Sequence, residues 1–158
     1  MGDLFVKGKN CCFAGHANIC NQDKIKEKLK KEIINLIKNY GVTEFYNGGK
    51  GDFDWLCAQC VDKLRKDYPF IKSYLILAYM PKEMDKSEYD DSTLALFDST
   101  LYPSIEKTPR RFAIVKRNEW MINNADFLIA YVDHSWGGAY KTFEYAKRKK
   151  HTSVINIG

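Results

Sequence analysis

The sequence lacks a long hydrophobic run and a recognisable targeting signal, and both absences narrow the class of protein. None of its apolar stretches approaches the roughly 18 to 20 residues that a membrane-spanning helix requires. Residues 1–16 contain too short an apolar run, and no suitably placed small-residue cleavage site, for a secretory signal peptide. Val6 stands where a myristoylation signal requires serine or threonine. We therefore expect a cytoplasmic protein that does not associate with membranes.

The cysteines are five in number and lack the even framework of a small secreted domain, so we expect reduced thiols. Cys57 and Cys60 form a CxxC pair, but the pair falls inside a predicted helix rather than at a helix start, and no second CxxC or CxxH completes a zinc site. They are interpreted as small buried residues, and neither a metal nor a cofactor is expected. The net charge of +5 fits a phosphate-bearing ligand but is too small to indicate nucleic-acid binding by itself.

Alternating strand and helix patterns predict a single domain over residues 1–158, with an α/β, Rossmann-like three-layer fold and a mostly parallel central sheet. Asn21 is expected to cap the first helix and Gly41 to end it. Residues 80–109 contain three of the four prolines and are interpreted as an irregular excursion, a lid or an interface, with a short helix near 87–97. Strands are predicted at 10–15, 43–47, 71–79, 126–132 and 153–157, and helices at 21–40, 55–68, 110–124 and 138–150.

Glycines stand at three of the expected strand-to-helix turns. In a parallel sheet these turns meet at the carboxyl edge, where ligands bind. Glycine there permits positive φ and a close approach of the backbone, and the following helix N-terminus favours an anion such as phosphate. Each turn alone is more simply a tight turn, and NGGKGD is neither a dinucleotide fingerprint nor a P-loop. Three turns at one edge nevertheless favour a binding crevice. The glycines concerned are Gly15, Gly48, Gly49, Gly51, Gly137 and Gly138.

The segments CCFAGH, FYNGGKGDFD, RNEWMINNADFLIAYVDHSWGGAYKTFEYA and VINI together resemble the YpsA-like branch of the SLOG superfamily, over about residues 10–157. That superfamily also contains the LOG phosphoribohydrolases and the DNA-processing protein DprA. The resemblance implies a Rossmann-like fold that binds a nucleotide or a nucleotide-derived molecule, in proteins that often form homo-oligomers. Members include hydrolases of N-glycosidic bonds, binders of single-stranded DNA, and sensors or sequestering proteins for nucleotide signals in antiviral immunity.

The resemblance also implies a catalytic pair. Arg117 stands where the LOG enzymes have an arginine, and Glu144 is the nearest match to their glutamate. Such a carboxylate stabilises positive charge that develops on the sugar, while the guanidinium holds a phosphate. Lys141 precedes Thr142 where the LOG pattern has a third glycine, and this departure favours binding over hydrolysis. The alternatives are an ion pair on the helix face for Glu144 and a surface salt bridge for Arg117.

The remaining candidate ligand residues surround the glycine turns. Asp54 would accept hydrogen bonds from ribose hydroxyls, or cap a helix. His16 would contact a phosphate, or lie exposed at its turn. Trp136 would stack on a base, or cover the sheet edge. The set is completed by Asn118, Ser135 and Thr142.

Three functions follow from these patterns. We predict a protein that senses or sequesters a nucleotide-derived small molecule at the carboxyl edge of its sheet. The first alternative is an N-glycoside hydrolase that uses Glu144 and Arg117. The second is a binder of single-stranded DNA of the DprA type, in which the partner would be a nucleic acid.

Overall fold

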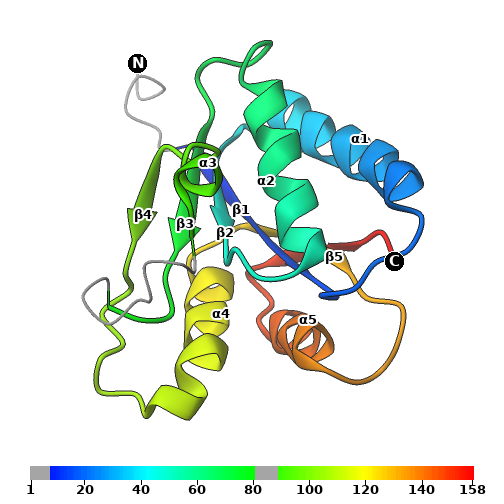
Figure 1. The fold of residues 1–158 in the computed structure, drawn as a ribbon. Coiled ribbons are helices and arrows are strands. Elements are labelled where there is room, and N and C mark those ends of the chain that lie inside the picture. The colour runs from blue at the N-terminus through cyan, green and yellow to red at the C-terminus, as the bar shows by residue number, and fades with distance from the viewer. Residues whose placement is uncertain (1–7, 81–88) are drawn as a thin grey trace.

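The computed structural model describes residues 8–80 and 89–158, and every strand in these residues belongs to one six-stranded sheet (Figure 1). The strand order is β4-β3-β2-β1-β5-β6, and each neighbouring pair is parallel. The predicted Rossmann-like α/β fold is therefore confirmed, and within the described residues its sheet is wholly parallel. The strands are β1 (Lys9–Gly15), β2 (Val42–Asn47), β3 (Lys72–Ile76), β4 (Ser99–Leu101), β5 (Phe127–Tyr131) and β6 (Ser153–Asn156).

Helices cover both faces of the sheet. The longer helices α1 and α2 lie on one face and α4 and α5 on the other (Figure 1). Among the helices of the described residues, none is long and apolar enough to cross a membrane. The helices are α1 (Gln22–Tyr40), α2 (Asp52–Leu64), α3 (Asp91–Leu94), the 3-10 helix η3 (Arg110–Phe112), α4 (Ala113–Asn123) and α5 (Gly138–Arg148).

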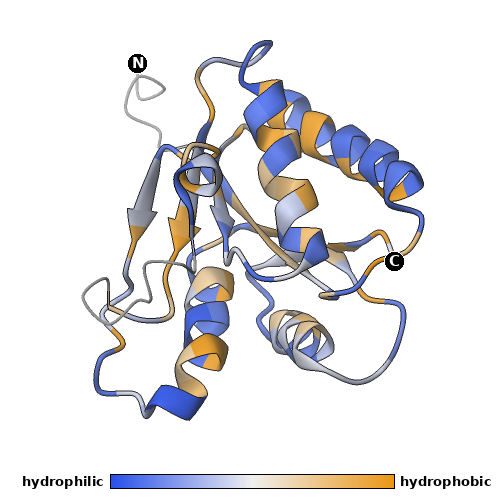
Figure 2. Ribbon diagram, in the orientation of Figure 1, coloured by the Kyte–Doolittle hydropathy of each residue, from blue (hydrophilic) through white to orange (hydrophobic). Residues whose placement is uncertain are grey.

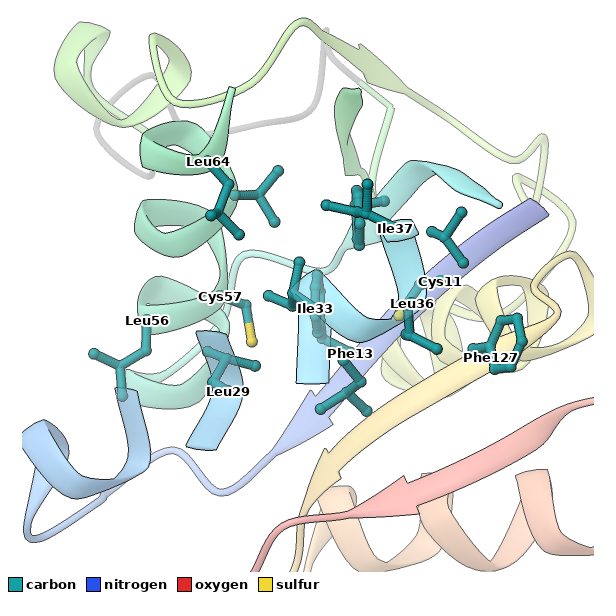
Figure 3. Close-up of a cluster of buried hydrophobic side chains, with 14 of the residues drawn as sticks. Cys11, Phe13, Leu29, Ile33, Leu36, Ile37, Leu56, Cys57, Leu64 and Phe127 are labelled. Carbon is teal, nitrogen blue, oxygen red and sulfur yellow. The ribbon is translucent and has the colours of Figure 1, made fainter. Parts of the chain in front are cut away.

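The larger hydrophobic core lies between the sheet and helices α1 and α2 (Figure 3). Leu29, Ile33 and Leu36 recur at helical spacing along α1 and are almost completely buried. They pack in one cluster with Phe13 from β1 and Cys57 from α2. Burial raises the pKa of the Cys57 thiol well above its ordinary value. Figure 2 shows the matching pattern, because α1 is hydrophobic toward the sheet and hydrophilic on its outer side.

The ends of the helices and strands follow mostly from the local sequence. One predicted helix cap is absent, and one short strand was not predicted. Gly41 adopts φ 71° and ends α1 as predicted, its N–H donating to the Leu36 carbonyl. Asn21 directly precedes α1 but adopts φ 56°, and within the described residues its side chain makes no capping hydrogen bond, so the predicted cap is absent. The short strand β4 was not predicted, because its three residues gain their extended form from pairing with β3. Part of the predicted excursion, residues 81–88, lies outside the described residues.

The sheet reverses its direction of growth at β1. From β1 the chain adds β2, β3 and β4 on one side, and it then returns to place β5 on the other side of β1. The loops that follow β1 and β5 consequently lead to helices on opposite faces of the sheet. Such a topological switch point opens a crevice beyond the carboxyl ends of the two strands, which is where doubly wound folds bind ligands.

Two glycines with the same backbone conformation precede the helices that flank this crevice. Gly51 has φ 92° and ψ 174° before α2, and Gly137 has φ 93° and ψ 175° before α5. This region is essentially restricted to glycine. A Cβ on Gly51 would lie 2.6 Å from the Ala17 Cα, whereas no described residue lies within 4 Å of a Cβ on Gly137. The start of α2 is therefore packed against the loop after β1, and the start of α5 is open.

Alanine substitution at these two glycines separates backbone strain from steric overlap. Either substitution forces an L-residue into a conformation that costs about 1–3 kcal/mol. Gly51→Ala also creates an overlap with the Ala17 backbone, so we expect it to lower the free energy of unfolding by about 1–3 kcal/mol more than Gly137→Ala does. Urea denaturation measures both values. Equal losses would contradict the packing of the loop against α2.

Candidate functional site

A cavity of about 480 Å³ opens at the switch point, within the size range of small-molecule sites. Its wall combines the end of β1 and the following loop with residues from α2, α4 and the start of α5. Most of the residues predicted to bind a ligand meet here although they are far apart in the sequence. Those that line the cavity are Gly15, His16, Asp54, Arg117, Asn118, Trp136, Gly137, Gly138 and Thr142.

The first turn of α5 forms one wall of the cavity. Gly137, Gly138 and Ala139 line it, and within the described residues no side chain caps this helix. Thr142 Oγ1 donates to the Gly138 carbonyl at 3.1 Å and accepts from Asn118 Nδ2 at 3.3 Å, which links the turn to α4. The first amides of a helix have no partner within it and attract anions. This wall is therefore suited to a phosphate or a carboxylate.

The start of α2 differs, because the loop after β1 occupies it. Asp52 N donates to the Ala17 carbonyl at 2.8 Å, and Asp52 Oδ2 accepts from Ile19 N at 3.0 Å. Gly49 and Gly51, predicted to form the second side of the crevice, do not line the cavity. They permit close packing instead, Gly49 against Leu75 and Gly51 against Ala17. Lys50, which was not a predicted ligand residue, is the residue of this turn that lines the cavity.

Arg117 is buried and joins α4 to the ends of two strands. Its NH1 group donates to the carbonyl oxygens of Gly48 at 2.8 Å and Ile76 at 3.0 Å, and its Nε donates to Asn118 Oδ1 at 2.8 Å. A Cβ on Gly48 would lie 2.9 Å from the guanidinium carbon. Gly48, a predicted ligand residue, thus permits the close approach of Arg117 and does not line the cavity. Arg117 is buried rather than exposed at the surface, and its positive charge borders the cavity.

Asp54 is the acidic side chain that lines this cavity. Its Oδ2 accepts from Lys50 N at 2.9 Å, and its backbone carbonyl accepts from Asn47 Nδ2 at 2.8 Å. Burial raises the pKa of its carboxyl to about 6, although the Lys50 N–H and the positive charge of Arg117 act in the opposite direction. Asp54 therefore exchanges its proton closer to neutral pH than an ordinary carboxyl does.

Glu144, the predicted catalytic carboxylate, does not line the cavity. Its Oε1 lies 3.3 Å from Lys147 Nζ one turn further along α5, so it forms the ion pair that was the alternative interpretation. The reason is helical periodicity: Glu144 follows Thr142 by two residues, which turns its side chain about 200° away from the cavity. Ser135, another predicted ligand residue, also does not line the cavity.

Three aromatic side chains that line the cavity pack on one another in a row, with His16 and His134 stacked and Trp136 tilted against His134. His16 and His134 lie with ring centroids 3.6 Å apart at 10°, and His134 and Trp136 lie 4.1 Å apart at 32°. Trp136 is 71% exposed, whereas His16 is buried rather than exposed at its turn. His134 was not predicted, although the run DHSW directly after a strand places two rings two residues apart. The stack ends in an indole that a planar ligand can cover.

Asp133 holds the two histidines in this stack. Its backbone N–H donates to His16 Nε2 at 3.1 Å, and its Oδ1 lies 2.8 Å from His134 Nδ1. Desolvation and the adjacent His134 lower the pKa of His16, against the opposite effect of the Asp133 charge. The atoms of His16, Asp133 and His134 that could bind a metal ion lie within 4.8 Å of one another. The two rings are almost parallel, however, so one metal ion could not lie in both ring planes as coordination requires.

Comparison with known proteins identifies relatives in sequence and in fold. The YpsA model, described as "YspA SLOG family", matches residues 15–157. The uncharacterized SPbeta prophage-derived protein YoqJ of Bacillus subtilis (strain 168) is 29% identical over 141 residues, which covers 79% of this chain and 81% of YoqJ.

Two solved structures share the fold. DNA processing protein A from Helicobacter pylori, described with a single-stranded DNA binding mode, gives a TM-score of 0.60 at 13% identity. The match covers 93% of this chain but only 65% of that protein. The X-ray structure of TM1055 gives a TM-score of 0.51 at 12% identity and covers 94% of this chain and 91% of that chain. At these identities the two structures establish the fold alone.

The raised pKa of Asp54 makes the stability of the folded chain dependent on pH. Because the pKa is about 6 in the folded protein and 3.8 in the unfolded reference, the folded state binds the proton more tightly, and stability falls as pH rises from about 4 to about 6. Asp54→Asn removes this loss. We expect the unfolding free energy of the variant, relative to wild type, to increase by about 2–3 kcal/mol between pH 4 and pH 7 in urea denaturation. A difference that does not vary with pH would contradict the burial of this carboxyl.

Proposed function

Because this chain belongs to the YpsA-type SLOG family, we propose that it binds a nucleotide or a nucleotide-derived phosphate ligand in the cavity at the switch point. We further propose that residues 1–158 act as a single domain that senses or sequesters this ligand. The observation that carries the proposal is the meeting, in one cavity, of an uncapped helix N-terminus and an exposed aromatic ring. These two features suit the phosphate and the base of a nucleotide.

The phosphate would bind at the first turn of α5. The N–H groups of Gly138 and Ala139 belong to that turn, and the helix dipole adds to their attraction for an anion. Lys50 and Arg117 supply two positive charges to the same cavity. Arg117 is held by hydrogen bonds to two backbone carbonyls, so its charge is in place before the ligand arrives. Such preorganisation lowers the cost of binding.

The base would stack on Trp136. One face of this indole is supported by His134, which in turn packs on His16, while the side chain as a whole stays largely exposed. A base stacked on an aromatic ring gains about 1–3 kcal/mol. The ribose would be bound by Asp54, whose carboxyl borders the cavity and can accept hydrogen bonds from sugar hydroxyls.

Binding without hydrolysis is the favoured function. Glu144 is paired with Lys147 outside the cavity lining, so the glutamate of the LOG pattern has no counterpart at the ligand. Among the described residues, Asp54 is the carboxylate that lines the cavity and could take part in hydrolysis of an N-glycosidic bond. Single-stranded DNA is the second candidate ligand, supported by the fold shared with the DNA processing protein A and by the same exposed Trp136.

A thermal-shift screen against nucleoside monophosphates, followed by chromatography of each stabilising compound after incubation, tests the proposal. A ligand that binds only the folded state raises the melting temperature, and we expect one that is recovered intact. Recovery of free base and sugar phosphate would establish a hydrolase. Affinity that rises with oligonucleotide length and falls steeply with salt would favour DNA. Absence of any stabilising nucleotide would reject the proposal.

Trp136→Ala is expected to weaken nucleotide binding without affecting the anion site. Losing a stacking gain of about 1–3 kcal/mol corresponds to a roughly 5- to 150-fold higher Kd for the nucleotide. The Kd for inorganic phosphate should stay within about twofold of wild type, since the ring is not needed at the start of α5. Phe70→Ala is the matched control, because Phe70 is also exposed but does not line the cavity. Isothermal titration calorimetry measures all three proteins, and an unchanged nucleotide affinity in Trp136→Ala would place the base elsewhere.

A further inference from the structure

A second cavity, of about 270 Å³, lies beyond the first at the same carboxyl edge of the sheet. Its lining begins at Ala78 and Tyr79, which follow β3, and continues through the segment between β4 and α4. A small connecting pocket shares lining residues with both cavities. Lys50, Ile114 and Arg117 belong to its lining and to that of the first cavity, while Ala78 and Tyr79 belong to its lining and to that of the second.

The two cavities differ in charge. The first has the Lys50 ammonium, the Arg117 guanidinium and the start of α5, which favour an anion and outnumber the single Asp54 carboxylate. The second has one charged group of each sign among the described residues that line it, the Arg110 guanidinium and the Glu106 carboxylate. Their effects on a phosphate offset each other, so the second cavity does not favour an anion over an uncharged group.

The polar groups of the second cavity suit a hydroxyl-bearing ring. The Arg110 guanidinium carbon lies 4.5 Å from the centre of the Tyr79 ring, which holds the side chain by a cation–π contact. Thr108 and Tyr102, two residues with hydroxyl groups, also line the cavity. A sugar hydroxyl can donate to Glu106 and accept from Arg110, so both charges would be satisfied by a neutral polyol.

We propose that the second cavity binds a sugar joined through phosphate to the nucleotide in the first cavity, so that the ligand class is a nucleoside diphosphate sugar. This inference rests on the proposed function, because it needs a nucleotide in the first cavity. The connecting pocket has a volume of only about 10 Å³. Its wall includes the exposed Lys50 side chain, which has the rotamer freedom to move aside while its ammonium pairs with the diphosphate.

Calorimetry with matched ligand pairs tests this inference. The pairs are ADP with ADP-glucose, GDP with GDP-mannose, and UDP with UDP-glucose, each titrated into the wild-type chain. We expect the sugar to tighten binding by about tenfold or more in the pair whose base the protein accepts. Arg110→Ala should abolish this gain and leave the affinity for the free diphosphate unchanged. Arg111→Ala is the matched control, since Arg111 is exposed, packs over Phe112 and does not line the cavity, and it should retain the gain.

The outcomes separate this inference from the proposed function. If a nucleoside diphosphate binds and its sugar derivative binds no tighter, the second cavity is not a sugar site and the proposed function stands. If the gain is present but survives both Arg110→Ala and Glu106→Gln, the sugar binds elsewhere and the inference is also overturned. If no nucleotide of any pair binds, the proposed function and this inference fail together.

Discussion

The pairing of β1 with β2 on one side and with β5 on the other is the constraint on which the site depends. All three strands are parallel, so their carboxyl ends meet at one edge. The chain leaves β1 and β5 toward opposite faces of the sheet, and the separated loops open the cavity. The hydrophobic cores on the two faces hold this arrangement, because successive β1 side chains point to opposite sides and Cys11 and Phe13 pack beneath α1 and α2 while Cys12 and Ala14 pack beneath α4 and α5.

Two helix starts with the same glycine conformation have acquired different surroundings. Before α2, the Ala17 carbonyl accepts the Asp52 amide and the loop after β1 covers the turn. Before α5, the corresponding turn lines the cavity. An anion can therefore approach one helix dipole and is kept from the other. Lys50 and Arg117 add positive charge to the same cavity, so the first cavity favours an anion before any ligand is present.

Periodicity was enough to predict the fold, because buried strands and amphipathic helices are properties of the local sequence. The order of turns along the chain likewise predicted where a crevice would form. The contacts inside the crevice join residues that are far apart in the sequence, so local patterns could not predict them. The sequence does not show that Ala17 blocks the turn at Gly51, or that Gly48 is small so that Arg117 can reach a carbonyl. A one-residue change in spacing turns a helical side chain by about 100°, so the departure of this chain from the LOG spacing accounts for the position of Glu144 outside the cavity lining.

We propose that an anionic nucleotide binds at the start of α5 with its base on Trp136. A two-dimensional NMR titration with a nucleoside monophosphate tests this by following the chemical shifts of the backbone amides and the indole. We expect saturating changes at the amides of Gly138 and Ala139 and at the Trp136 indole. We expect no comparable change at the Asp52 amide, which donates a hydrogen bond to the Ala17 carbonyl. Saturating changes at the start of α2 with none at α5, or changes confined to the lysine-rich outer face of α1, would contradict it.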